Sequence, residues 1–124
     1  MKNQKASERE IVNVGVDKIE VSEIVMLQAT INYTIIYLNN GKQYLSAKTI
    51  KSYEDLCEKD SFLRIHRSYI INTEYLTDYS FVNSYVVLSN TIKASISRRC
   101  KNQFRMYYSQ RKKRIETQRK SQFH

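Results

Sequence analysis

The 124-residue sequence contains no proline, no tryptophan and only two glycines. No repeat and no linker-like segment is evident, so we expect one compact domain with a modest core. Cysteine is also scarce, because Cys57 and Cys100 stand alone without CxxC spacing, and only two histidines are present. This shortage of ligands argues against a structural zinc site. Both cysteines are expected to be small apolar residues in a reducing compartment.

Long apolar runs are missing as well. No run approaches the roughly 18 residues that a membrane-spanning helix needs. The segment 1–10 is polar rather than signal-like. We therefore expect a cytoplasmic protein that does not contact a membrane. We also expect no cofactor, no small-molecule substrate and no enzyme, since no nucleophile with an orienting acid accompanies His66 in the sequence.

Charge is concentrated at the C-terminus. Residues 1–97 contain 11 Lys and Arg against 11 Asp and Glu, whereas residues 98–124 contain 10 Lys and Arg against the single acid Glu116. The net charge of +9 therefore belongs to the last segment. Such a block serves an anionic partner or remains a solvated tail, and both readings stay open here.

The rest of the chain has the pattern of a small antiparallel β domain. Apolar residues alternate or run continuously over short stretches that are separated by polar turns. The expected strands are 11–16, 18–21, 24–27, 33–38, 42–45, 75–80, 84–88 and 91–96, together with two short strands within 62–72 on either side of a polar tip. The turn Asn39-Asn40-Gly41 is the strongest local signal, because Asn and Gly tolerate the positive φ of tight hairpins.

Two helices are expected between and after these strands. Thr49 is the expected N-cap of a short internal helix whose apolar positions are Ile50, Tyr53 and either Leu56 or Cys57, ending near 58–61. A second helix is expected to start after Ser97, with a stripe of Cys100, Phe104 and Tyr107 or Tyr108. Helix beyond about Gln110 is not expected, because little apolar face is left. The resulting division is a polar extension at 1–10, a domain at 11–104 and a basic helix or tail at 105–124.

The most informative stretch is 62–72, which reads FLRIHRSYIIN. Leu63 and Ile65 alternate with Arg64 and His66, which is the period of a half-buried strand. An apolar run of strand-prone residues resumes after the polar tip. Two stiff strands would therefore hold that tip.

The tip 66–68 contains neither Gly nor Pro, so backbone geometry does not explain it. Arg67 at this place would offer a rigid fork of donors to a phosphate or a guanine edge. The alternative is a surface turn whose Arg pairs with an acid. For Arg64, a phosphate clamp and an ion-pair partner are equally open.

The same eleven residues resemble the signature of the LytTR domain (LytR/AlgR family), a bacterial DNA-binding module of response regulators. That signature has an aromatic, an Arg, an aliphatic, a His, a basic or polar residue, a Ser, an aromatic and a closing Asn, all present here without a gap. The resemblance extends more loosely from about Val12 to about Phe104. It implies a mainly β fold and a role in transcription regulation. It also implies that loops, rather than a recognition helix, enter successive major grooves of bent DNA, and that two protomers bind a repeated site.

In that family the module usually follows a receiver domain. The residues before the first expected strand are too few to form one. The expectation is therefore either a stand-alone DNA-binding module or a fragment of a longer chain.

Three segments are expected to contact double-stranded DNA. Asn32 and Tyr33 match the family in the first loop, although Gln28 and Ile31 stand where members often have an acid and a Gly. Arg67 is the polar position after the motif's His, and the segment after the last strand is similar to a frequent Ser-Arg-Arg pattern. The expected DNA-binding residues are Asn32, Tyr33, Arg64, His66, Arg67, Ser68, Ser97, Arg98, Arg99 and Lys101. The alternatives are an RNA-binding β module and a protein-interaction module with a solubilising tail.

Overall fold

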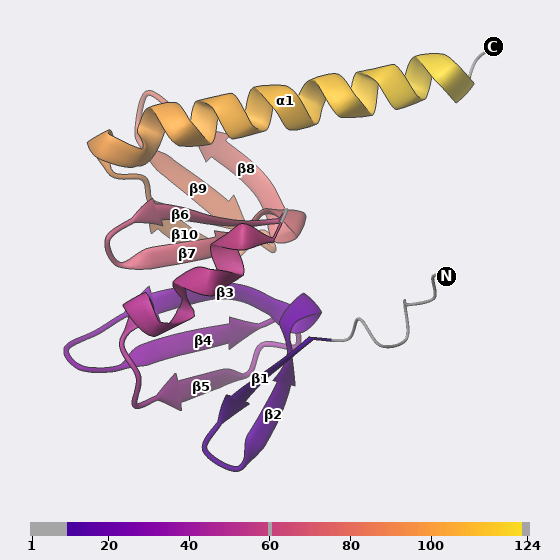
Figure 1. The fold of residues 1–124 in the computed structure, drawn as a ribbon. Coiled ribbons are helices and arrows are strands. Elements are labelled where there is room, and N and C mark those ends of the chain that lie inside the picture. The colour runs from indigo at the N-terminus through magenta and orange to yellow at the C-terminus, as the bar shows by residue number, and fades with distance from the viewer. Residues whose placement is uncertain (1–9, 60, 123–124) are drawn as a thin grey trace.

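The computed structural model describes residues 10–59 and 61–122, with side chains described up to residue 110. The expected polar extension therefore lies outside the described residues except for Glu10. A five-stranded antiparallel sheet in the order β5-β4-β3-β7-β6 forms the centre of the fold (Figure 1). Its strands are β3 (Ile24–Ala29), β4 (Thr34–Leu38), β5 (Gln43–Ser46), β6 (Phe62–His66) and β7 (Tyr69–Asn72).

Two smaller sheets flank the central one. A hairpin forms the first, and a three-stranded sheet in the order β10-β9-β8 lies under the C-terminal helix (Figure 1). The remaining elements are β1 (Ile11–Val14), β2 (Asp17–Glu20), η2 (Val21–Glu23), η3 (Ile50–Glu58), η4 (Thr73–Tyr75), β8 (Leu76–Ser80), β9 (Tyr85–Leu88), β10 (Ile92–Ser95) and α1 (Arg98–Gln122).

Each face of the five-stranded sheet covers a separate apolar core. On one face, β3 and β4 pack against η3 and the β1–β2 hairpin, through residues such as Ile36 and Tyr53. On the other face, Leu63 and Ile65 pack against the three-stranded sheet and Phe104 of α1. The apolar run of β3 is buried throughout because both faces of the sheet are covered. The register shift between Ile24 and Met26 accompanies the placement of Val25 and Met26 in the same core.

The expected strands are all present, with bounds that differ by up to two residues. The mainly antiparallel β fold with one C-terminal helix confirms the expected fold class. The turn after β4 is also confirmed, because Gly41 adopts a φ of +89° and its N–H donates to the carbonyl of Leu38 at 3.0 Å.

The internal helix differs from the expectation in its type. It is a 3-10 helix, in which three residues per turn align Ile50, Tyr53 and Leu56 on one buried face. Thr49 precedes it in extended conformation, but its side chain makes no capping hydrogen bond. Thr49 therefore occupies the expected N-cap position without a side-chain cap, and the end at Glu58 is confirmed.

The C-terminal helix also differs. Ser97 caps it as expected, because the N–H of Cys100 donates to the Ser97 hydroxyl at 3.1 Å. The stripe is confirmed as well, with Phe104 buried and Tyr107 packed beside it. The expected end near Gln110 is wrong, since α1 continues to Gln122. Arg, Lys, Glu and Gln are good helix formers, and neither Gly nor Pro interrupts them. No helix in the described part of the chain combines the length and apolarity of a membrane span.

Candidate nucleic-acid interface

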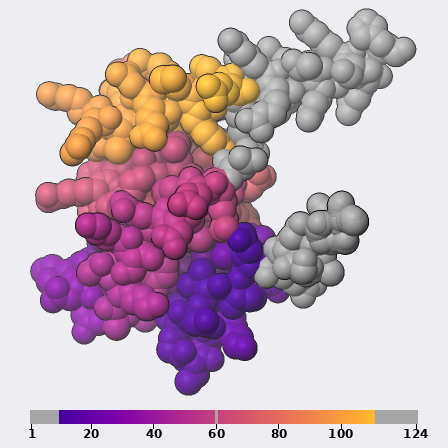
Figure 2. Space-filling model, viewed as in Figure 1, coloured from indigo at the N-terminus to yellow at the C-terminus, as the bar shows by residue number. Residues whose placement is uncertain are grey.

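The three expected contact segments lie at one end of the fold. The backbone N–H of Ala29 donates to the carbonyl of Ser68 at 2.8 Å, which joins the β3–β4 loop to the β6–β7 tip. The N–H of Ser97 donates to the carbonyl of Ile65 at 2.8 Å, which joins the start of α1 to the same tip. We call residues 30–33, 66–68 and 97–101 together the loop edge, which lies at the left in Figures 1 and 2.

The β3–β4 loop is a tight turn fixed by its backbone. The N–H of Thr30 donates to the carbonyl of Tyr33 at 2.9 Å, so Ile31 and Asn32 form its tip. Asn32 adopts a φ of +67°, a conformation that Asn accepts more readily than most residues. Ile31 and Tyr33 are 86% and 45% exposed. Both predicted residues of this loop, Asn32 and Tyr33, are therefore available to a partner.

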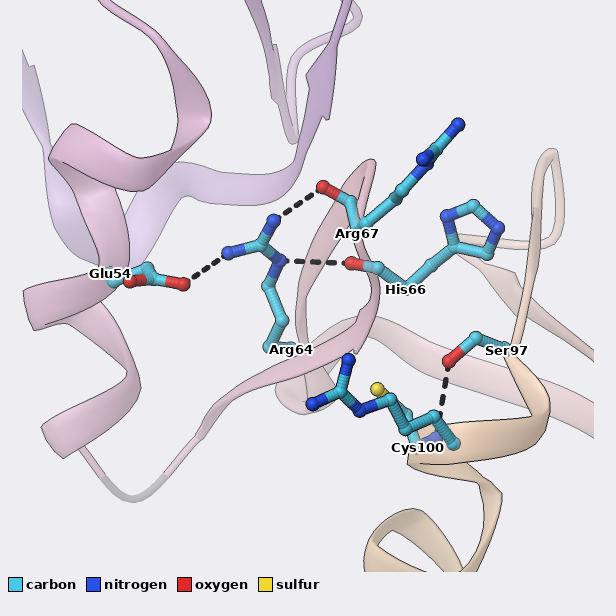
Figure 3. A pocket seen from close by; sticks show the side chains of 7 residues that line it. Glu54, Arg64, His66, Arg67, Ser97 and Cys100 are labelled. Carbon is cyan, nitrogen blue, oxygen red and sulfur yellow. Dashed lines mark hydrogen bonds and ion pairs between the residues drawn. The ribbon is translucent and has the colours of Figure 1, made fainter.

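The β6–β7 tip is fixed by side chains. The Arg64 guanidinium donates from Nε to the carbonyl of His66 at 2.8 Å and from Nη2 to the carbonyl of Arg67. Its Nη1 pairs with the carboxylate of Glu54 on η3 (Figure 3). Of the two roles left open for Arg64, the ion pair is the one that the structure contains. The Arg67 side chain, in contrast, is exposed and turns away from this cluster (Figure 3).

His66 adds a second side-chain constraint to the tip. Its Nδ1 accepts the backbone N–H of Ser68 at 3.0 Å, so the neutral ring carries its proton on Nε2. The ring also packs against Tyr69, with 5.3 Å between centroids. His66 therefore presents a hydrogen-bond donor, and Arg67 beside it carries donors only.

The start of α1 is electropositive for two reasons. Arg98 and Arg99 occupy its first turn and are exposed, and the first turn contains no acid. The helix dipole places further partial positive charge at this end. A first turn of cations opposes the preference of an isolated helix, which favours acids there. This end of the helix therefore attracts anions.

A cavity of about 510 Å³ opens between the tip and the start of α1 (Figure 3). It is lined by Glu54, Arg64, His66, Arg67, Ser97, Arg99 and Cys100. The structure thus gathers five of the predicted DNA-binding residues around one hollow. Asn32, Tyr33, Ser68, Arg98 and Lys101 belong to the loop edge but do not line the hollow.

Glu54 and Cys100 were not among the predicted site residues. Glu54 lies ten positions before Arg64 on a separate helix, and no sequence pattern connects the two. Cys100 was predicted only as part of the helix stripe. Cys57 lies near Arg64, and burial raises the pKa of its thiol, as expected for an inert cysteine. Among the described residues, no group of three or more His, Cys, Asp or Glu side chains could hold a metal ion.

A β domain that presents donor-rich loops and a cationic helix start at one edge has the chemistry of a nucleic-acid-binding module. Residues 15–109 match the family model described as the LytTr DNA-binding domain. The chain belongs to this family, and the predicted resemblance is confirmed.

Individual relatives agree with the family assignment. The chain is 35% identical over 68 residues to the transcriptional regulatory protein LytR of Staphylococcus aureus strain N315, a match that covers 52% of this chain and 27% of that protein. The protein of the same name from strain MW2 has the same identity and coverage. The match thus spans about a quarter of the length of these curated relatives. A solved LytTr DNA-binding domain from Bacillus cereus superimposes with a TM-score of 0.64 at 21% identity, covering 80% of this chain and 94% of that one.

Proposed function

We propose that the loop edge binds double-stranded DNA sequence-specifically, as the DNA-binding part of a transcription regulator. The observation that carries this proposal is the pair of backbone hydrogen bonds that join three segments distant in sequence at one edge. Each segment presents exposed polar or cationic side chains there. Loops, rather than a helix laid in a groove, would therefore enter the major groove.

The tip is the proposed base-reading element. Arg67 has a planar fork of donors, and His66 offers its Nε2–H beside it. A donor-rich tip complements acceptors, and guanine presents two acceptors, N7 and O6, in the major groove. We expect a G·C pair in the preferred site opposite Arg67. Asn32 could donate and accept, so it fits an adenine edge.

Cationic residues of α1 are the proposed phosphate contacts. Arg98, Arg99 and Lys101 lie in its first turn or just after it. Arg105 follows one turn later, with its guanidinium 4.8 Å from the centroid of the Phe81 ring. The run 111–114 continues the positive charge along the chain, although its side chains lie outside the described ones. These contacts would strengthen binding without carrying sequence information.

A pair of protomers on a repeated site remains an expectation from the family. Sedimentation of the protein with and without a duplex that carries one or two half-sites would measure this stoichiometry. A single protomer bound per two-half-site duplex would contradict it.

Selection of bound sequences from a random duplex library tests the proposed function. We expect a short enriched motif, tighter binding to it than to a scrambled duplex, and a steep loss of affinity with salt. Structured RNA at matched salt should compete poorly against the selected duplex. Absence of any enriched motif, or stronger competition by RNA, would contradict the proposal.

A further inference from the structure

We propose that Arg64 is a positioning residue for DNA recognition and that Glu54 of η3 holds it in place. Arg64 would fix the backbone of the tip 66–68, so that Arg67 reaches the base edge in a preset orientation. This inference rests on the proposed function of the loop edge. It assigns to Glu54, an acid beside a DNA-binding surface, a role that promotes specific binding.

The tip lacks the backbone conformation that stabilises the β3–β4 turn, and its backbone bond from Ala29 holds only the carbonyl of Ser68. It contains no glycine, and neither Arg67 nor its two neighbours adopts a positive φ, unlike Asn32 in the β3–β4 loop. The carbonyls of His66 and Arg67 instead accept hydrogen bonds from one guanidinium. A planar fork can bind both at once, whereas an ammonium group has no such fixed geometry.

Glu54, the acidic partner of Arg64, lies on a helix whose apolar face is buried in the core. Glu54 follows Tyr53 on η3, and Tyr53 is 6% exposed. Leu56, two positions after Glu54, is also buried. Helix η3 packs directly against β6 and β7. The carboxylate of Glu54 therefore has a rigid base, and its pairing with Arg64 ties the tip to that base.

A direct phosphate contact by Arg64 fits these observations less well. Three of its five donor positions are directed to protein acceptors, and its side chain is only 24% exposed. Glu54 also neutralises its charge locally. Arg67, with no such partner among these bonds and an exposed side chain, is better placed to reach DNA.

The two roles predict opposite effects when Glu54 loses its charge. If Arg64 contacts phosphate, Glu54→Gln frees a cation, which should tighten binding to every duplex and steepen the salt slope of log affinity by ~0.9. If Arg64 positions the tip, Glu54→Gln should loosen the tip. The preference for a selected over a scrambled duplex should then fall roughly tenfold, as expected for weakening a charge-assisted hydrogen bond.

Asp55→Asn is the matched control. Asp55 is exposed on the same helix, and the substitution removes the same charge without touching the partners of Arg64. We expect Asp55→Asn to leave the preference unchanged. Arg64→Lys should reduce the preference although it keeps the positive charge. A wild-type preference in Glu54→Gln or in Arg64→Lys would overturn the inference.

A measurement without DNA separates this inference from the proposed function. In the free protein, amide hydrogen exchange at Arg67 and Ser68 should be faster in Glu54→Gln than in wild type or Asp55→Asn, while exchange in β3 stays unchanged. Equal exchange in all three proteins would overturn the inference that Glu54 and Arg64 fix the tip, even if DNA is bound specifically. Failure of the wild type to select any duplex sequence, with faster tip exchange in Glu54→Gln, would instead overturn the proposed function alone.

Discussion

Two hairpin tips lie next to each other at the loop edge and are stabilised in different ways. The β3–β4 turn depends on backbone conformation, with Asn32 at positive φ and one closing hydrogen bond. The β6–β7 tip depends on side chains, because Arg64 and His66 bind its backbone. A tip of the first kind tolerates changes that respect its φ values. A tip of the second kind depends on residues outside it.

This difference relates to what each tip can present. A turn with a residue at positive φ favours Asn, Asp or Gly at that position. A tip that is held by Arg64 and His66 does not require a positive φ at its outermost residue. The residue type at Arg67 is therefore not limited by backbone conformation. The side-chain-supported tip is thus the better place for a base-reading residue.

The largest change in the free energy of unfolding is expected from truncating the buried side chains of β6, the strand that leads into the tip. Ile65 is 0% exposed and packs in the core beneath the three-stranded sheet. Ile65→Ala should destabilise the fold by about 2–5 kcal/mol, since it leaves a cavity. Leu63→Ala should have a similar effect. Leu45→Ala, at a side chain 61% exposed on β5, is the control and should change the free energy of unfolding little. Denaturant titration measures all three, and an unchanged midpoint for Ile65→Ala and Leu63→Ala would contradict the packing.

The next effect concerns recognition at the same tip. Arg67→Ala should reduce affinity for the preferred duplex by ~1–3 kcal/mol, because a bidentate contact to a base is lost. Binding to a scrambled duplex should change much less, and the melting temperature should stay the same. Fluorescence anisotropy with both duplexes measures this difference. An equal loss on both would show that Arg67 contacts phosphate only.

A smaller effect distinguishes the backbone-supported turn. Asn32→Ala should destabilise the protein by about 1 kcal/mol, because alanine adopts a positive φ at a cost, whereas Asn32→Gly should be nearly neutral. Both variants lack the Asn32 amide, so both should lose the same DNA affinity if that amide contacts a base. Equal stability of the two variants would contradict the assigned turn geometry.

The smallest expected effect on sequence discrimination comes from the basic end of α1. Deleting 111–124 removes six Lys and Arg together with Glu116. Each lost phosphate contact should reduce the salt slope of log affinity by ~0.9, while the preference for the selected duplex stays constant. Folding should be nearly unaffected. An unchanged slope would mean that this segment does not touch DNA.

The strands and the first turns could be predicted because their signals are local. Alternation in β6 and the Asn-Asn-Gly turn after β4 are contained within a few residues. The pairing of β3 with β7 was not predicted, because it joins segments about forty residues apart. The 3-10 geometry of η3 was also missed, since its apolar spacing of three fits an α-helix almost as well.

The candidate site shows the same limit. The motif placed Arg67 at a tip, and the structure joins that tip to the two other expected segments. Glu54 could not be found from the sequence, because an ion pair between a helix and a strand depends on their packing. Arg64 was therefore left with two roles until its partners were known.

Amide chemical-shift mapping with the selected duplex would locate the surface that contacts DNA. If the loop edge binds DNA, the amides of Asn32, Arg67 and Arg99 should shift together. The turns at Gly41 and Asn90, which lie at the opposite ends of β4 and β9, should not shift. Shifts centred on those distant turns, with the loop edge unchanged, would show that DNA does not bind at the loop edge.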